Sequence, residues 1–308
     1  MAREEIKVYG PATVSNVGPG FDLMGFALEA PGDEMIIRRN GTDKLVLVNQ
    51  TDSQLPLDPE KNVAAVAARS LLIALGSYEG FDLIFTRKIP PGSGVGSSAA
   101  SCVAAVMGIN ELMGSPFDTE DLVPFAMEGE KLASGSTHAD NIAPALLGGI
   151  TLIRSYDPID IKHLSYPDDL WCTVVHPFLE ILTEESRKLI PGTLPLETAL
   201  KQAGNLAALV AGLSTGDYPL IGRSITDHIA EPYRIGQIPD FDQLKESALK
   251  AGSVGTGLSG SGPSVFSLCR GEEMAATVGQ VKQEHFSTRG IESRVYVSRI
   301  SEAGCKII

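Results

Sequence analysis

The most informative part of the chain is Ile89-Pro90-Pro91-Gly92-Ser93-Gly94-Val95-Gly96-Ser97-Ser98-Ala99-Ala100. A predicted strand over residues 81–86 leads into it, and a predicted helix over residues 97–112 leads out of it. Its three alternating glycines let a phosphate group approach the backbone closely, because they carry no Cβ atom. The unpaired N–H groups and the dipole at the start of the helix also favour an anion. This phosphate loop (residues 89–97) therefore predicts a nucleotide site, without the Lys-Ser/Thr ending of a Walker A loop.

Two other interpretations of the phosphate loop stay open. Gly94-x-Gly96-x-x-Ala99 fits a dinucleotide-binding fingerprint on spacing alone. That fold needs a second strand after the helix, whereas here another helix is expected. The loop could also be a purely structural glycine-rich turn.

Composition excludes several classes of protein. The chain has 308 residues, 43% hydrophobic and 20% charged, which is typical of a globular protein with room for two domains. Its formal net charge of −13 argues against a nucleic-acid or anionic-membrane partner, because both require a basic face. No apolar secretory segment or run of ~20 apolar residues occurs, so we expect a cytoplasmic protein. Four distant cysteines predict reduced thiols: Cys102, Cys172, Cys269 and Cys305.

The chain divides into two mixed halves. Residues 155–169 are polar and contain proline, so they are the candidate linker, and we predict domains over 1–168 and 169–308. The predicted strands cover residues 6–14, 35–39, 44–48, 81–86, 150–153, 170–175 and 293–297, with two more around the turn at 259–263. The predicted helices cover residues 62–75, 97–112, 119–132 (capped by Asp118 or Thr119), 183–189, 196–213, 218–229, 241–251 and 273–285.

Two further glycine-rich segments frame the phosphate loop, over residues 16–25 and 255–264. Each alone could be a structural turn. In this order and spacing, the three segments resemble the GHMP kinase superfamily of small-molecule kinases over the whole chain. Four details resemble the branch of that superfamily that phosphorylates homoserine: Asn16-x-Gly-Pro-Gly-Phe-Asp22, His138-Ala-Asp140-Asn141-Ile-Ala-Pro144, Thr183-x-x-x-Arg187 and Glu231-Pro-Tyr-Arg234.

This resemblance implies an α+β fold of two domains. The first is ribosomal-S5-domain-2-like with a left-handed βαβ unit, an exception to the usual handedness, and the second is ferredoxin-like. The implied reaction is ATP-dependent phosphorylation of the side-chain hydroxyl of L-homoserine to O-phospho-L-homoserine in threonine biosynthesis, by a homodimer. Two alternatives remain: a kinase for another small alcohol (mevalonate- or shikimate-like), and a non-catalytic member that binds a metabolite or nucleotide.

The resemblance also implies roles for residues around ATP. It places adenosine contacts near Asn62 and Lys88, and Mg²⁺ on Ser98 and Glu130, whose oxygens suit that ion. Without the resemblance, Glu130 could equally be a residue on a solvated helix face. The remaining ATP contacts are expected from Gly260 and Gly262 and from the phosphate loop with the start of its helix: Pro90, Pro91, Gly92, Ser93, Gly94, Val95, Gly96, Ser97, Ser98 and Ala99.

Homoserine is a zwitterion with a terminal hydroxyl. Its carboxylate suits bidentate arginine, so Arg187 and Arg234 are the candidates, although each could instead form a surface ion pair. Its ammonium needs an acidic partner, for which Asp22 is the candidate, assisted by Asn16. We expect His138 to act as a neutral hydrogen-bonding group, because no metal ligands have suitable spacing to it.

The expected catalytic base is missing. Where mevalonate kinases carry an aspartate, this chain has Asn141, directly after Asp140. An amide cannot accept the proton. Either Asp140 takes the role, or a γ-phosphate oxygen takes the proton while Asp140 and Asn141 orient the hydroxyl. We favour the second hypothesis, because positioning supplies most of the catalysis in phosphoryl transfer.

Overall fold

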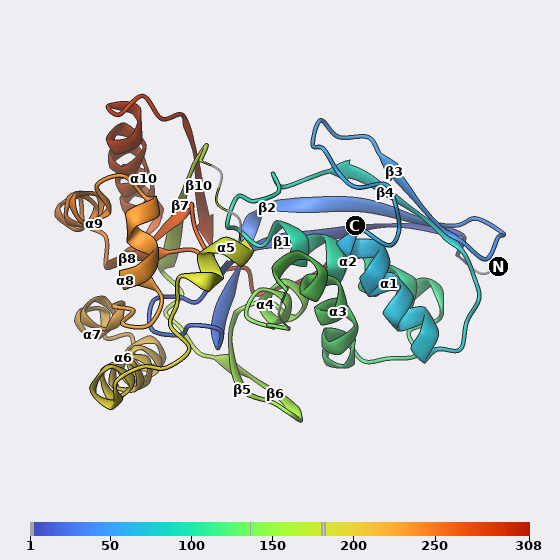
Figure 1. Ribbon diagram of the computed structural model, residues 1–308, viewed down its shortest axis with the longest axis horizontal. Helices are drawn as coiled ribbons and strands as arrows, with labels where there is room; N and C mark the ends of the chain where they lie inside the picture. Colours follow the sequence, from blue (N-terminus) through green and yellow to red (C-terminus); the bar gives the residue numbers. More distant parts are fainter. Residues whose placement is uncertain (1–2, 136, 180, 182) are drawn as a thin grey trace.

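The computed structural model describes residues 3–135, 137–179, 181 and 183–308, and its described strands form two sheets that lie side by side (Figure 1). The first sheet has seven strands, with the order β11-β1-β2-β4-β3 and with β5 paired to β2 and β6 to β5. The second has four strands in the order β10-β7-β9-β8. The expected mixed α+β fold is therefore confirmed.

The first sheet carries its helices on one face (Figure 1). Strands β3 and β4 are parallel neighbours joined through α1, which is the expected βαβ unit, and the other strand pairs are antiparallel. The strands are β1 (Glu5–Ser15), β2 (Met24–Arg39), β3 (Leu45–Asn49), β4 (Phe81–Arg87), β5 (Ile150–Tyr156), β6 (Ile159–Leu164) and β11 (Lys306–Ile307). The helices are α1 (Val63–Ala74), α2 (Ser97–Leu112), η1 (Glu120–Leu122), α3 (Val123–Ser134) and α4 (Ile142–Leu147).

Helix α2 is the central helix of this half, and small residues let it pack closely. Ala99, Ala100, Ala104 and Ala105 are fully buried. A Cβ added at Gly108 would lie 2.2 Å from Ile37 Cδ1 of β2. Because protein cores are close-packed, this contact fixes the axis of α2 on the sheet, and with it the direction in which its N-terminus points.

The second sheet has the strand order expected of a ferredoxin-like domain. It consists of β7 (Leu170–Pro177), β8 (Gly255–Leu258), β9 (Val265–Arg270) and β10 (Ser293–Arg299), all antiparallel. Helix α10 (Glu272–Ser287) packs on β7, β9 and β10. The chain between β7 and β8 forms α5 (Thr183–Lys188), α6 (Leu196–Thr215), α7 (Tyr218–Ser224), α8 (Glu231–Arg234), η2 (Ile235–Gln237) and α9 (Phe241–Lys250).

Three local predictions differ from the structure. The candidate linker over 155–169 contains β6, which forms an antiparallel hairpin with β5. As an edge strand, β6 tolerates the polar residues that argued for a linker. Helix α3 begins only at Val123, without a side-chain cap, so the predicted cap by Asp118 or Thr119 is wrong. Pro124 explains the late start, because proline fits the first turn of a helix.

One further helix prediction needs correction, and one helix was not predicted. The helix expected over 218–229 ends at Ser224, and α8 forms a separate short helix. Helix α4 was not predicted. It follows α3 after residues 135–141, of which residue 136 lies outside the described residues.

Strand β11 pairs with β1, so the end of the chain returns to the first sheet. The domain boundary after residue 168 stays a prediction.

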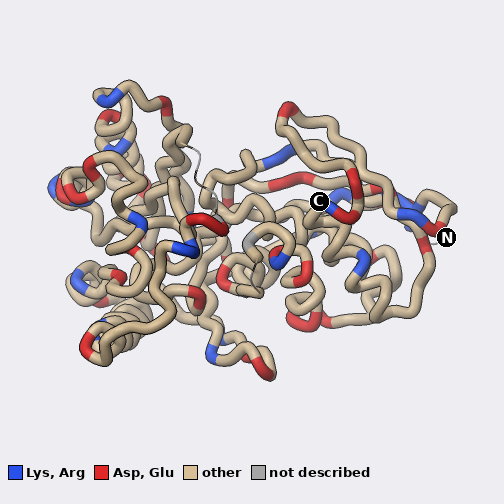
Figure 2. The backbone as a smooth tube through the Cα atoms, viewed as in Figure 1, with Lys and Arg blue, Asp and Glu red and all other residues tan. Residues whose placement is uncertain are grey.

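The charge distribution and the cysteines fit the composition. Figure 2 shows Lys and Arg interspersed with Asp and Glu over both halves. No helix within the described ranges is long and apolar enough to cross a membrane. All four cysteines are buried and free.

Candidate active site

The three glycine-rich segments meet at one cavity of about 370 Å³. Val95 and Ala99 do not line it, because they are buried in the core, and neither Pro90 nor Gly262 is part of its wall. The predicted residues that line it are Asn16, Asp22, Asn62, Lys88, Pro91, Gly92, Ser93, Gly94, Gly96, Ser97, Ser98, Glu130, His138, Asp140, Asn141, Arg187, Arg234 and Gly260.

The phosphate loop adopts a shape that requires its glycines. Gly92, Gly94 and Gly96 have φ values of 72°, 74° and 67°, in the left-handed region that favours glycine. A Cβ at Gly96 would also lie 1.9 Å from Thr13 Oγ1. Gly96 is the N-cap of α2 and offers no side-chain hydrogen bond to the first turn. The start of α2 is therefore suited to an anion in the cavity.

The third glycine-rich segment holds the phosphate loop from the second domain. Ser259 Oγ donates to the carbonyl of Gly94 at 2.6 Å, and Ser264 Oγ donates to the carbonyl of Ser93 at 2.5 Å. A Cβ at Gly94 would lie 2.7 Å from the carbonyl oxygen of Gly262. Gly262 thus supports the loop from behind, whereas Gly260 lies on the cavity wall.

Ser98 and Glu130 form an oxygen-rich pair beside the start of α2. Ser98 Oγ donates to Glu130 Oε2 at 2.7 Å. Burial raises the pKa of Glu130 to about 7, and the Asp140 charge adds to this against the Ser98 hydrogen bond and the Lys88 charge. A hydroxyl and a carboxylate suit Mg²⁺. No cluster of three His, Cys, Asp or Glu side chains that could hold a metal occurs among the described residues, so an ion here would need phosphate oxygens as further ligands.

The side chains of Lys88 and Asn62 are engaged within the protein. The Lys88 ammonium lies 2.8 Å from Asp33 Oδ2 and donates to the carbonyl and the hydroxyl of Ser97. Asn62 caps α1, its Oδ1 accepting the N–H of Ala64 at 3.0 Å. Contacts from Lys88 and Asn62 to a nucleotide stay predictions.

Asp22 and Arg187 form a bidentate ion pair on the cavity wall, with distances of 2.8 and 2.7 Å. The loop that carries Asp22 is closed by Asn16, whose Oδ1 accepts the Asp22 N–H at 3.0 Å and whose Nδ2 donates to Gly260 at 3.0 Å. Asn16 and Asp22 have φ values of 68° and 58°, which asparagine and aspartate tolerate better than most residues. The pair thus bridges the two domains.

Arg234 is a buried cation. It is 3% exposed, and its Nη1 donates to the carbonyl of Gly260 at 3.1 Å. Its guanidinium and that of Arg187 lie over the ring of Phe21, at 5.5 and 5.1 Å. Within the described part of the chain, no carboxylate lies within ion-pair distance of Arg234. Because an unpaired buried charge is costly, this position favours an anionic ligand.

His138 also presents unused polar atoms. Among the described residues, neither of its ring nitrogens has a hydrogen-bond partner, although both are buried. Burial lowers the pKa of His138 more than the Asp22 carboxylate, 3.8 Å away, raises it. The ring is therefore a neutral donor or acceptor on the cavity wall.

Asp140 and Asn141 are held against the end of β1. Asn141 Nδ2 donates to Ser15 Oγ at 3.0 Å, and its Oδ1 accepts the hydroxyl of Thr13 at 2.6 Å. Burial raises the pKa of Asp140 to about 7, and the Asp22 charge raises it further against a hydrogen bond from Ser15. Asp140 is therefore able to exchange a proton near neutral pH.

Several residues that shape this site were not predicted. Thr13 and Ser15 interrupt the apolar pattern of β1 at alternate positions, a signal that marks polar side chains on one face of a strand. Phe21 lies within the motif over residues 16–22 but was given no role, and Asp33 carried no comparable signal. Asp33 is fully buried in β2, beneath the phosphate loop.

Comparisons with known proteins identify this fold and site. The family description "GHMP kinases N terminal domain" matches residues 62–149, and "GHMP kinases C terminal" matches residues 205–287. A crystal structure of L. major mevalonate kinase in complex with R-mevalonate shares the fold, with a TM-score of 0.76, 16% identity and coverage of 97% of this chain and 99% of that one. The chain thus belongs to the GHMP kinase superfamily.

Two nearer relatives define the branch within that superfamily. A homoserine kinase of Chlorobium phaeobacteroides (strain BS1) is 43% identical over 314 residues, covering 97% of this chain and 98% of the relative. The crystal structure of homoserine kinase from Cytophaga hutchinsonii matches with a TM-score of 0.95 and 46% identity, covering 100% of this chain and 98% of that one. The chain is a member of the homoserine kinase family.

Proposed function

We propose that this chain acts as a homoserine kinase, transferring the γ-phosphoryl group of ATP to the side-chain hydroxyl of L-homoserine. The products are ADP and O-phospho-L-homoserine. Family membership supports the reaction. The geometry also supports it, because one cavity contains both an anion site at the start of α2 and a set of charged groups suited to an amino acid.

The observation that carries the choice of acceptor is the buried guanidinium of Arg234, without an ion-pair partner among the described residues, beside the Asp22–Arg187 pair. We propose that the substrate carboxylate binds Arg234 and Arg187, and that its ammonium binds Asp22. Substrate binding then replaces the Asp22–Arg187 ion pair by two others, one between the substrate carboxylate and the arginines and one between its ammonium and Asp22. No buried charge is left without a partner. Mevalonate and shikimate carry a carboxylate but no ammonium and would leave Asp22 unpaired.

Ser98 and Glu130 are the groups that would hold Mg²⁺. Their oxygens fit a hard cation, and a cation would keep the Glu130 carboxylate ionised despite its burial. When bound, the ion neutralises charge on the phosphate groups. The chain itself positions the phosphates through the N–H groups at the start of α2.

We propose that no dedicated protein base is needed. Asn141 is tied to Ser15 and Thr13 and cannot accept a proton. Asp140 orients the hydroxyl, and a γ-phosphate oxygen takes its proton, consistent with a loose transition state. The raised pKa of Asp140, about 7, favours the alternative in which Asp140 itself is the base, since efficient bases have a pKa near the working pH.

A coupled ATPase assay tests the acceptor. The chain should turn over homoserine, and should turn over mevalonate, shikimate and galactose only weakly. A larger kcat/KM for mevalonate or shikimate would refute the acceptor and leave the superfamily intact. Turnover of none of the four would favour a non-catalytic metabolite-binding role.

We further propose a cytoplasmic homodimer. Four buried free thiols suit a reducing compartment, and the dimer is the expectation from the family resemblance. Light scattering during gel filtration gives the mass; that of one chain would exclude the dimer.

A further inference from the structure

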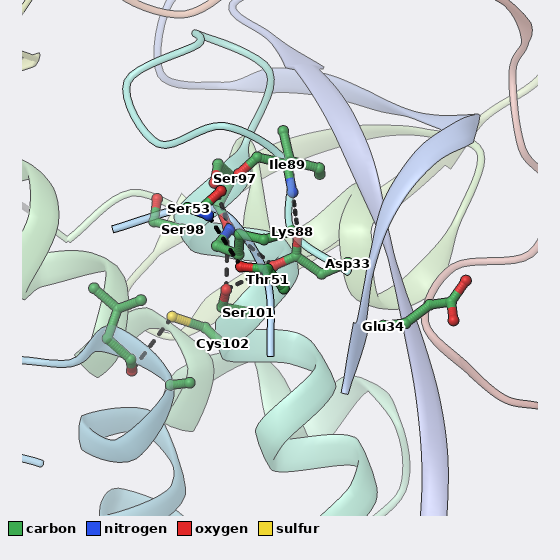
Figure 3. Close-up of polar contacts among 12 residues, drawn as sticks. Asp33, Glu34, Thr51, Ser53, Lys88, Ile89, Ser97, Ser98, Ser101 and Cys102 are labelled. Carbon is green, nitrogen blue, oxygen red and sulfur yellow. Dashed lines mark hydrogen bonds and ion pairs between the residues drawn. The ribbon is translucent and has the colours of Figure 1, made fainter. Parts of the chain in front are cut away.

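A fully buried carboxylate, that of Asp33, lies directly beneath the phosphate loop (Figure 3). It stands on β2, outside the three glycine-rich segments. Its Oδ1 accepts the N–H of Ile89 at 2.7 Å, and its Oδ2 accepts the hydroxyl of Ser101 at 2.7 Å. Ile89 begins the phosphate loop and Ser101 lies on α2 after it, so one side chain joins both ends of the loop.

Lys88 completes this connection. Its ammonium lies 2.8 Å from Asp33 Oδ2 and donates to the carbonyl and the hydroxyl of Ser97, so its three donors all have partners. The hydroxyl of Ser97 in turn donates to the carbonyl of Ile89 at 2.8 Å. The side chains of Lys88 and Asp33 are 4% and 0% exposed. The pair is therefore shielded from water, and it connects the start of the phosphate loop to the first turns of α2.

The charge balance of this pair has a consequence for the ligand. A lysine below a phosphate loop could turn toward the phosphates, as a point charge does in other nucleotide sites. Here Asp33 neutralises Lys88 and directs it toward α2. The anion is then met by backbone N–H groups, whose direction depends on how firmly the loop ends are held.

We infer that Asp33 is a positioning residue for phosphoryl transfer: with Lys88, its buried carboxylate ties the entry of the phosphate loop to the first turns of α2, so that the N–H groups there stand in place before ATP binds. This inference rests on the proposed function. Asp33 is not part of the cavity wall, so it would act on the phosphate groups through the loop and α2 rather than by direct contact.

The variant Asp33→Asn tests this role in the full chain. It keeps an acceptor for Ile89 but removes the charge that holds Lys88. We expect the KM for ATP and the inhibition constant of ADP to rise about 10- to 100-fold, the range for lost charge-assisted hydrogen bonds. The KM for homoserine and the inhibition constant of adenosine, which lacks phosphates, should stay within about twofold.

A matched control separates positioning from folding. Asn110→Ala, at the other end of α2, removes a bond to the Phe117 carbonyl at 2.9 Å and one from its N–H at 3.2 Å. We expect it to lower Tm and leave the KM for ATP unchanged. If Asp33→Asn behaves like this control, Asp33 only stabilises the fold and the inference is overturned.

A second variant covers the case in which Asp33→Asn fails to fold. Asp33→Asn with Lys88→Met removes both charges, which proteins often tolerate better than one unpaired buried charge. Its ADP constant should still rise, and an unchanged constant would overturn the inference. ADP binding needs no acceptor, so the outcome for Asp33 stands even if homoserine is not turned over and the proposed function fails.

Discussion

The two ends of the active-site cavity are built in different ways. At the phosphate end, the groups that shape the loop already have partners: Lys88 uses its three donors, and Ser259 and Ser264 hold the loop carbonyls. At the acceptor end, Asp22 and Arg187 bind each other, and Arg234 has no carboxylate partner among the described residues. In the proposed function, the phosphate end is thus preorganised, whereas the acceptor end exchanges partners when homoserine binds.

With two such different parts, one cavity can serve two kinds of ligand. Phosphate groups are met by fixed backbone N–H groups, and preorganised dipoles need no rearrangement when charge develops. An amino acid is recognised by opposite charges, and the Asp22–Arg187 pair keeps those charges compensated until the substrate arrives. In this proposal, selectivity for the acceptor depends on side chains, and phosphate binding depends on the backbone.

The largest effect should come from Glu130→Gln at the phosphate end. An amide binds Mg²⁺ more weakly than a carboxylate, so we expect kcat to fall about 10²- to 10⁴-fold, in line with several kcal/mol of charge stabilisation by a metal. Steady-state kinetics over a Mg²⁺ titration measures this. Glu128→Gln, at an exposed position on the same helix, is the control and should be neutral. Normal turnover of Glu130→Gln at limiting Mg²⁺ would remove Glu130 from the site.

Glu130→Gln should also change how the stability of the protein depends on pH. The folded-state pKa of Glu130 is raised to about 7 from 4.5, so the folded chain holds a proton that the unfolded chain releases between these values. The free energy of unfolding should therefore fall as pH rises from about 4.5 to 7, and Glu130→Gln lacks this contribution. Without Mg²⁺, the Tm of the variant relative to the parent should rise over this interval. A constant difference contradicts the burial argument.

The next largest effect is expected at the acceptor end, from Arg234→Leu. The change removes a buried cation that contacts the substrate carboxylate in the proposal, so the KM for homoserine should rise about 10- to 100-fold. The KM for ATP should not change. Thermal stability should hold, because leucine leaves no buried charge. The exposed Arg223→Leu is the control. An unchanged homoserine KM would place the carboxylate elsewhere.

Arg187→Leu should have a smaller effect, because the Arg187 side chain is 36% exposed and its ion pair is screened by water. We expect the homoserine KM to rise about tenfold. The loss of Arg187 also frees Asp22 for the substrate ammonium, which offsets part of the cost. A rise as large as that of Arg234→Leu would show that the carboxylate is held equally by both arginines.

The smallest effect is expected from Asp140→Asn. Asparagine can still hydrogen-bond the hydroxyl, so kcat should fall less than about tenfold and the pH–rate profile should keep its shape, since a lost general base typically costs about 10²- to 10⁴-fold. If Asp140 is the base, the parent should lose activity as pH falls below its pKa of about 7. If kcat of Asp140→Asn falls by more than about 10³-fold and its pH–rate profile lacks the decline at acidic pH, Asp140 is the base.

The parts of the molecule that depend on local interactions could be predicted from the sequence. The bounds of α2 agree with the prediction over 97–112, because glycines before it and small residues within it define its start and its buried faces. Helix α1 spans Val63–Ala74, within one residue of the prediction over 62–75 at each end, whereas the role of Asn62 as its cap was not predicted. The motifs also predicted that Asp22, Arg187 and Arg234 share a site, and all three line one cavity.

Which of these groups are paired could not be predicted, because the pairing depends on how distant elements pack. Nothing local in the sequence links Asp33 to Lys88 and Ser101, or Asp22 to Arg187, because these partners come from separate strands and helices. The return of β11 to β1 and the pairing of β6 with β5 are likewise contacts between distant or polar segments. Local patterns report burial and helix ends, whereas the partner of a buried charge is set by how the elements pack. The proposed division between a fixed phosphate end and an exchangeable acceptor end depends on those partners.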